Sequence, residues 1–200
     1  MVKIFSDSTC DLSQELLEKY DISILPLHIL LGEKEYCDGV DITPDEIFQW
    51  SDAQKTTPKT SAPALDMAME MLEPFVKEKQ PVICFSISED MSTSANVMRM
   101  AASELEAEDL VTVIDSASLS TGIGLLVLHA AEMAQAGKTV EEIQTEIEEL
   151  KSKVRASFVV DTLVYLYRGG RCNGLAAMFG SALHLHPMIV VENGKMHSSK

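Results

Sequence analysis

The chain has few basic residues. Its 16 Lys and Arg are outnumbered by 31 Asp and Glu, which gives a formal net charge of −15. Because a field of this sign repels phosphate backbones and anionic lipid headgroups, the composition argues against a nucleic-acid-binding protein. Long hydrophobic runs are also missing. The longest apolar stretches, residues 22–31 and 122–131, are much shorter than the roughly 20 residues of a membrane-spanning helix, so we expect no transmembrane segment.

Signals for export, disulfides and metal sites are equally scarce. Residues 2–5 form a strand-like run directly after Met1, without the basic start and apolar core of a signal peptide, so we expect a cytoplasmic protein. The histidines form no HxxxH or HExxH pair, which predicts no metal site. The cysteines lie singly, without a CxxC pair, which predicts reduced thiols: Cys10, Cys37, Cys84 and Cys172.

Three motifs of common enzyme folds are absent. The sequence contains no GxSxG nucleophile elbow, no GxGxxG dinucleotide fingerprint and no GxxxxGK[ST] phosphate-binding loop, and no cofactor is expected. What remains is the composition of a globular protein with a sizeable core, since 46% of the residues are hydrophobic and 24% are charged.

Short apolar runs alternate with helical patterns over most of the chain. Repeated strand and helix units predict an α/β fold, in which residues 1–156 form a parallel sheet between two helix layers. A polar loop is expected at residues 52–63. The predicted strands are residues 2–5, 22–31 with a hairpin through 32–34, 82–85 and 110–114, and the predicted helices are residues 12–20, 44–51, 65–76, 92–105, 118–136 and 139–154.

A second, partial α/β domain is expected at residues 157–200. Asn193-Gly194 is the strongest hairpin signal in the chain, because both residues readily adopt positive φ angles. This region is short for an independent domain, so we expect that it packs on the first domain or is truncated. Its other predicted features are a strand at 158–160, a short helix at 162–167, a glycine turn at 168–171, a helix at 173–183 and a strand at 188–191.

Hydroxyl side chains follow three apolar strands at the point where each strand ends, in residues 6–9, 86–94 and 115–121. In a parallel sheet these turns share the carboxyl edge, where α/β folds bind ligands and where helix N-termini offer free N–H groups. Thr60-Ser61 adds a fourth group ahead of a helix. The pattern indicates a carboxylate or phosphate site, although each cluster alone is more typical of ordinary helix caps.

Two further features each leave two interpretations open. Arg168 and Arg171 flank two glycines and form either an anion or docking site or a structural ion pair. The sequence is also rich in methionine, which suits either a cavity for variable apolar chains or ordinary core filling. Six methionines lie in segments near the expected crevice: Met67, Met69, Met71, Met91, Met98 and Met100.

Several motifs together resemble the DegV family, whose members bind fatty acids and serve as the lipid-carrying subunits of bacterial fatty acid kinase. Residues 4–12 are similar to the family's DSTCDL segment, residues 60–64 to its TSxPS loop, and residues 113–124 to its DS…SxGxG turn. The closest match is FVVDTLVYLYRGGR at residues 158–171. The resemblance spans residues 2 to about 194.

The resemblance implies a protein that is not itself an enzyme. It would bind a long-chain fatty acid such as palmitate, stearate or oleate between its domains, with the carboxylate held by Thr60 and Ser92. A fatty acid kinase subunit would then phosphorylate the bound acid, and Arg168 and Arg171 would match the family's kinase-docking turn. The supporting residues of the pocket would be Ser61, Ser94 and Ser116.

The chain departs from the family pattern at several points. Thr93 stands where the family has Gly, Ala95 where it has Tyr, and His186 where it usually has Lys. Thr93 carries a β-carbon, which removes the easy left-handed backbone of Gly. Family members are also longer, and a distal segment with a His near the carboxylate has no counterpart here.

The alternative to a fatty-acid-binding protein is a Ser-dependent enzyme or a nucleotide-binding α/β protein. In such an enzyme, Ser92→Ala would abolish turnover.

Overall fold

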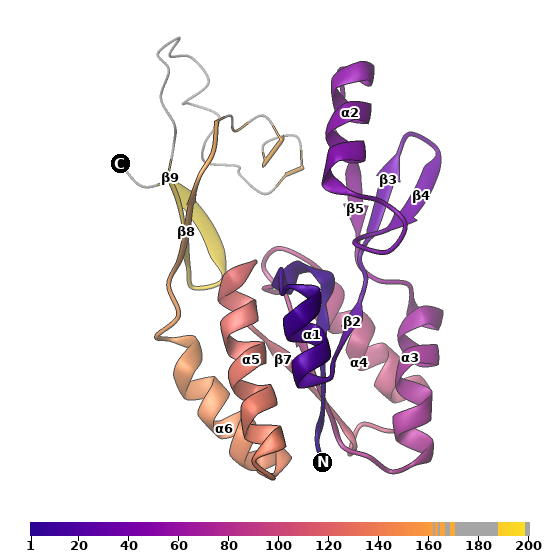
Figure 1. Cartoon of the computed structure of the whole chain (residues 1–200), viewed down its shortest axis with the longest axis vertical. Helices are drawn as coiled ribbons and strands as arrows, with labels where there is room; N and C mark the ends of the chain where they lie inside the picture. Colours follow the sequence, from indigo (N-terminus) through magenta and orange to yellow (C-terminus); the bar gives the residue numbers. More distant parts are fainter. Residues whose placement is uncertain (162, 164, 167–168, 171–187, 199–200) are drawn as a thin grey trace.

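A parallel sheet of four strands forms the centre of the molecule (Figure 1). The computed structural model describes residues 1–161, 163, 165, 166, 169, 170 and 188–198. The strand order is β2-β1-β6-β7, and every neighbouring pair is parallel, as the alternating pattern predicted. These strands are β1 (Lys3–Asp7), β2 (Ile22–Leu25), β6 (Val82–Ser86) and β7 (Val111–Asp115).

Helices cover both faces of this sheet, which confirms the predicted three layers. On one face, Ile83 packs in a cluster with Ile123 of α5 and Ile143 of α6. On the other face, Val82 packs with residues of α3 and α4, among them Met98. The first layer contains α1 (Gln14–Tyr20), α5 (Thr121–Gln135) and α6 (Val140–Lys151), and the second contains α3 (Leu65–Lys77) and α4 (Ser94–Glu104).

The prediction of one strand over residues 22–31 is wrong. β2 ends at Leu25, and after Pro26 the chain leaves the parallel sheet and enters a separate antiparallel one. Proline has no N–H to donate, so it cannot continue a ladder on both sides. The predicted hairpin through residues 32–34 is confirmed by the antiparallel pairing of β3 with β4.

The predicted loop at residues 52–63 is also wrong in part, because the preceding helix extends to Gln54 and Lys59–Ser61 form an edge strand of this small sheet. The strand order is β4-β3-β5, and helix α2 packs Ile47 and Trp50 against Ile29 and Leu31. The elements of this unit are β3 (His28–Leu31), β4 (Lys34–Cys37), α2 (Pro44–Gln54) and β5 (Lys59–Ser61).

A third sheet follows the last helix. It is antiparallel, in the order β10-β9-β8, with β8 (Ala156–Val159), β9 (Met188–Glu192) and β10 (Lys195–Ser198). Its hairpin turn is Asn193-Gly194, as predicted, with φ angles of 51° and 75°. The division into two domains at 156/157 stays a prediction. The predicted helix at 173–183, residues 162, 164 and 167 of the predicted helix at 162–167, and Arg168 and Arg171 of the glycine turn lie outside the described residues.

Both small sheets lie beyond the same end of the parallel sheet, one on each side (Figure 1). The N-terminus is at the opposite end, so this is the carboxyl edge of the strands. Within the described part of the chain, no helix is long and apolar enough to cross a membrane. The arrangement places the carboxyl edge of the parallel sheet between two additional walls.

Candidate functional site

The centre of the carboxyl edge is a topological switch point. The chain leaves β1 toward β2 on one side and returns to β6 on the other side of β1. Such a reversal opens a crevice between the two turns that follow these strands. Here the crevice is bounded by the 3₁₀ turn Ser8–Cys10 after β1 and by the loop from Ile87 to Thr93 after β6.

A cavity of about 720 Å³ lies at this crevice, within the range typical of small-molecule sites. The turns after β1, β6 and β7 form part of its lining, and the two small sheets supply the rest. Most of its lining residues are apolar: Leu27, Ile29, Ala62, Ile87, Met91, Leu119, Phe158, Leu166 and Met196. The polar lining residues are Thr9, Asp38, Thr60, Ser61, Glu89, Ser92 and Thr93.

The structure brings three of the sequence-predicted residues into this cavity. Thr60 and Ser61 come from β5, where Thr60 pairs in register with Ile29 of β3. Ser92 comes from the loop before α4. Helix α4 begins at Ser94, two residues later than predicted, so Ser92 lies in the loop before the helix.

Ser94 lies behind Ser92 and is fully buried. Their hydroxyl oxygens are 2.9 Å apart, so one donates a hydrogen bond to the other, and the backbone N–H of Ser94 also donates to Ser92 Oγ at 3.3 Å. These contacts fix the orientation of Ser92 at the cavity surface. Ser116 has a different location: its hydroxyl donates to the carbonyl of Ser118 at 3.3 Å within the β7–α5 turn, and it is absent from the described cavity lining.

Asp7 is a buried acid beneath the cavity that the sequence analysis did not single out. Its carboxylate accepts hydrogen bonds from the hydroxyl of Thr9 at 2.6 Å and from the backbone N–H of Ile87 at 2.9 Å. Burial raises the pKa of Asp7 above its ordinary value, while hydrogen bonds from Thr9, Ile87 and Ser94 oppose this rise. Asp7 therefore ties together the two turns that bound the crevice.

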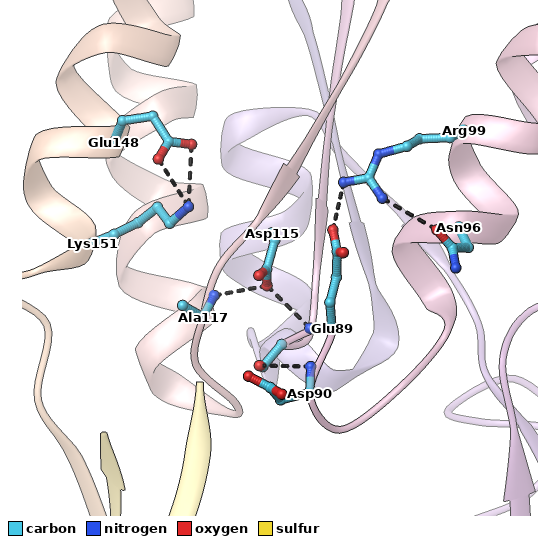
Figure 2. A network of polar contacts seen from close by, with 9 residues as sticks. Glu89, Asp90, Asn96, Arg99, Asp115, Ala117, Glu148 and Lys151 are labelled. Carbon is cyan, nitrogen blue, oxygen red and sulfur yellow. Dashed lines mark hydrogen bonds and ion pairs between the residues drawn. The ribbon is translucent and has the colours of Figure 1, made fainter. Parts of the chain in front are cut away.

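A charged network lies beside the cavity-lining residue Glu89 (Figure 2). Glu89 lines the cavity and forms an ion pair with Arg99, whose guanidinium also donates to Asn96. The carboxylate of Asp115 accepts hydrogen bonds from the backbone N–H of Glu89 at 3.3 Å and of Ala117 at 2.9 Å. This network joins the loop before α4 to the turn after β7.

The methionine pattern is explained mainly by core packing. Met98 is buried between α4 and the parallel sheet, while Met100 is 52% exposed. Of the six methionines near the crevice, Met91 alone is among the described cavity-lining residues. Met67, Met69 and Met71 pack against the same core cluster as Met98.

The apolar walls are the part of the site that sequence reasoning missed. Leu27, Phe158 and Met196 come from segments far apart in the chain and meet only in the folded molecule. Their sequence signal is that of ordinary strand residues, so it does not separate a cavity wall from a core position. No group of three or more His, Cys, Asp or Glu side chains suited to a metal ion occurs among the described residues.

Comparisons with known proteins agree on one family. The family model described as DegV matches residues 1–200. A DegV domain-containing protein of Clostridium perfringens is 37% identical over 196 residues, which cover 98% of this chain and 70% of that protein. A DegV domain-containing protein of Listeria innocua is 34% identical over 196 residues, with the same shares covered.

Solved structures show the same fold. A fatty acid (stearic acid)-binding protein from Eubacterium ventriosum superposes with a TM-score of 0.91 at 36% identity. A fatty-acid-binding DegV family protein from Thermus thermophilus has a TM-score of 0.89 at 31% identity. In both comparisons the match covers 100% of this chain and 70% of the other chain.

Proposed function

Because the chain belongs to the DegV family, we propose that it binds one long-chain fatty acid in the cavity at the carboxyl edge, with the carboxylate held by Thr60 and Ser92. The observation that carries the proposal is the composition of this cavity. It combines hydroxyl groups, which can donate hydrogen bonds to a carboxylate, with a majority of apolar side chains, which suit an acyl chain. The fatty acids named for the solved relatives support the same ligand class.

The acyl chain should supply most of the affinity. Burial of a C16 chain at about 0.8 kcal/mol per CH₂ contributes roughly 10 kcal/mol before the entropic costs of binding are subtracted. Palmitate, stearate and oleate are therefore the first ligands to test. The hydroxyls then mainly determine the orientation of the ligand, with its carboxylate toward Ser92 and Thr60.

The carboxylate would be held by neutral donors. The described cavity lining contains Asp38 and Glu89 but no Lys, Arg or His. A hydroxyl donor adds no charge to the site, so the ligand is recognised by the geometry of its hydrogen bonds. Ser94 supports this arrangement by its bond to Ser92, and Ser61 lies in the same cavity.

The surroundings of Ser92 favour binding over catalysis. A serine nucleophile needs a neighbouring base to take its proton. Among the described residues, the hydrogen-bond partners of Ser92 Oγ are the hydroxyl and the backbone N–H of Ser94, and neither is a base. We therefore propose that this chain carries the acid without reacting with it, and the family resemblance adds the proposal that a separate kinase subunit forms the acyl phosphate. The kinase subunit and the docking role of Arg168 and Arg171 rest on the family resemblance alone.

Native mass spectrometry of the protein tests this proposal. The expected result is a stoichiometric mass shift with palmitate, stearate or oleate, and a free fatty acid in an organic extract. Ser92→Ala and Thr60→Ala should each weaken palmitate binding by about 10- to 100-fold, because each removes a hydrogen bond to a charged group. Ser103→Ala, at an exposed serine that bonds Glu108, is the matched control and should leave binding unchanged. A wild-type protein that takes up none of these acids would contradict the proposal.

A further inference from the structure

Ser88 is a buried serine in the loop that carries Ser92, and it has no role in the function proposed above. It is 1% exposed, and it lies at the meeting point of three segments: the loop before α4, the β7–α5 turn and the β9–β10 turn. We propose that Ser88 is the positioning residue of the Ser92 hydroxyl and that it holds this position only while the β9–β10 turn is packed against it. This inference rests on the proposed function of Ser92.

The backbone of Ser88 organises the loop directly. Its carbonyl accepts hydrogen bonds from the N–H of Met91 at 2.9 Å and of Ser92 at 3.1 Å. Its own N–H donates to the carbonyl of Ser118 at 3.0 Å, in the β7–α5 turn. The location of Ser92 is therefore set by a turn that begins at Ser88 and is anchored to the neighbouring strand connection.

The side chain of Ser88 joins this turn to the third sheet. Its hydroxyl donates to the carbonyl of Gly194 at 2.7 Å and accepts a hydrogen bond from the N–H of Asp90 at 3.3 Å. At the rim of the same contact, the ammonium of Lys195 lies 3.5 Å from the carboxylate of Asp90. The contact spans 106 residues of sequence, so it forms only when the β9–β10 turn reaches the loop.

Gly194 allows this close approach. A β-carbon at this position would lie 2.7 Å from Ser88 Oγ, closer than real β-carbons pack, and 3.1 Å from Asp90 Oδ2, which is tighter than most real contacts. Gly194 also has a φ of +75°, which side-chain-bearing residues rarely adopt. The hairpin signal at Asn193-Gly194 thus serves a second purpose beyond turning the chain, because it brings a bare backbone against Ser88.

The same hairpin also contributes to the apolar part of the cavity. Met196, two residues after Gly194, is a cavity-lining residue of β10. One element therefore contacts the acyl chain through Met196 and orders the carboxylate-binding loop through Gly194. Docking of the hairpin and binding of the fatty acid must then stabilise each other, because each favours the same state of the loop.

A double-mutant cycle tests the action of Ser88 through Ser92. Ser88→Ala should weaken palmitate binding by about tenfold and should weaken binding of methyl palmitate, which lacks the carboxylate, by less than about twofold. In a Ser92→Ala background, Ser88→Ala should cost less than about twofold, because its effect passes through the missing hydroxyl. Equal losses for the two ligands, or losses that add fully, would show a general structural role and overturn the proposal.

A pair of glycine variants tests the role of the hairpin. Gly194→Ala introduces the clash with Ser88, whereas Gly137→Ala is a matched control with a φ of +80° and nothing within 4 Å of the added β-carbon. Without ligand, Gly194→Ala should raise the hydrogen exchange of the Met91 and Ser92 amides at least tenfold over Gly137→Ala. If this occurs but no fatty acid binds, the proposed function fails and the positioning role stands. Unchanged exchange overturns the positioning role whatever the ligand.

Discussion

The parallel sheet and the third sheet, β8–β10, differ in how deeply they are buried. Every residue of β1 and β6 is buried, because helices cover both faces of the parallel sheet. In the third sheet, Ile189 and Val191 are buried while Val159 and Met188 are 63% and 41% exposed. The cavity therefore has a floor built on the main core and a wall built on a sheet with one thinly packed face. We expect the parallel sheet to open only when the whole protein unfolds, and the third sheet to open by local unfolding at a lower free-energy cost.

Matched substitutions in the two sheets should give the largest contrast. Ile83 and Ile189 are both 0% exposed, so Ile→Ala removes the same atoms from each. Ile83→Ala should lower the global free energy of unfolding by about 2–5 kcal/mol, measured by urea denaturation. Ile189→Ala should mainly lower the hydrogen-exchange protection of β8–β10 and cost less in the global transition. Equal losses of global stability would mean that both sheets unfold as one unit.

The close packing of α5 on the floor gives the second prediction. A β-carbon on Gly124 would lie 2.8 Å from the carbonyl oxygen of Cys10 and 3.0 Å from a methyl of Leu12. Gly124→Ala should therefore destabilise the protein by about 1–3 kcal/mol despite the higher helix propensity of alanine. Thermal unfolding of the wild type and of Gly124→Ala measures this loss. A stabilised Gly124→Ala variant would show that α5 can move away from the turn after β1.

Local chemistry made much of this fold predictable. The Asn193-Gly194 turn and the start of α6 were identified from residue types that satisfy backbone requirements within a few positions. The exit of the chain from the parallel sheet at Pro26 is not predictable in this way. A continuous apolar run has the same pattern whether it forms one strand or two strands in different sheets. The edge strand β5 also has no local sequence signal. Its residues are polar, and they form a strand because they pair with β3 in the folded molecule.

The candidate site divides in the same way. Ser92 could be identified because hydroxyls after strands have a recognisable pattern, and Thr60 because it lies ahead of a helix in a motif that resembles the family's; both line the cavity. The sequence does not predict the burial of Asp7 or the contact of Ser88 with Gly194, because both depend on segments that folding brings together. A hydroxyl or carboxylate that works through a distant backbone group has no local sequence signal.

The raised pKa of Asp7, which lies at the end of β1 in the parallel sheet, predicts that the free energy of unfolding depends on pH. Because burial favours the neutral acid, the folded state keeps this proton at pH values where the unfolded chain, with an ordinary pKa of 3.8, has released it. The contribution of Asp7 to stability therefore falls as pH rises from 3.8 through the raised pKa, by at most about 1.4 kcal/mol for each pH unit.

Urea denaturation across this pH range, with Asp7→Asn as the variant that cannot titrate, measures the effect. The free energy of unfolding of the wild type should increase relative to Asp7→Asn as the pH is lowered toward 3.8. A difference that stays constant with pH would show that Asp7 keeps an ordinary pKa in the folded protein, and one that decreases on acidification would show that folding lowers this pKa.

The two capping boxes offer the finest comparison between the floor and a wall. Thr139 caps α6, which packs on the parallel sheet, and Thr43 caps α2, which packs on the small β3–β5 sheet. The side chain of each Thr accepts a hydrogen bond from the N–H of a Glu three residues later. Thr139→Ala should cost about 1 kcal/mol of global stability. Thr43→Ala removes the equivalent cap bond and also the hydrogen bond from the Thr43 hydroxyl to Glu46 Oε2 at 2.7 Å, and it should instead lower the hydrogen-exchange protection of α2 with a smaller global loss. Thr145→Ala, within α6, is the control and should not lower stability, because its hydroxyl donates to a carbonyl of its own helix and alanine has the higher helix propensity. Equal global losses at Thr139 and Thr43 would show that the α2 wall unfolds together with the floor.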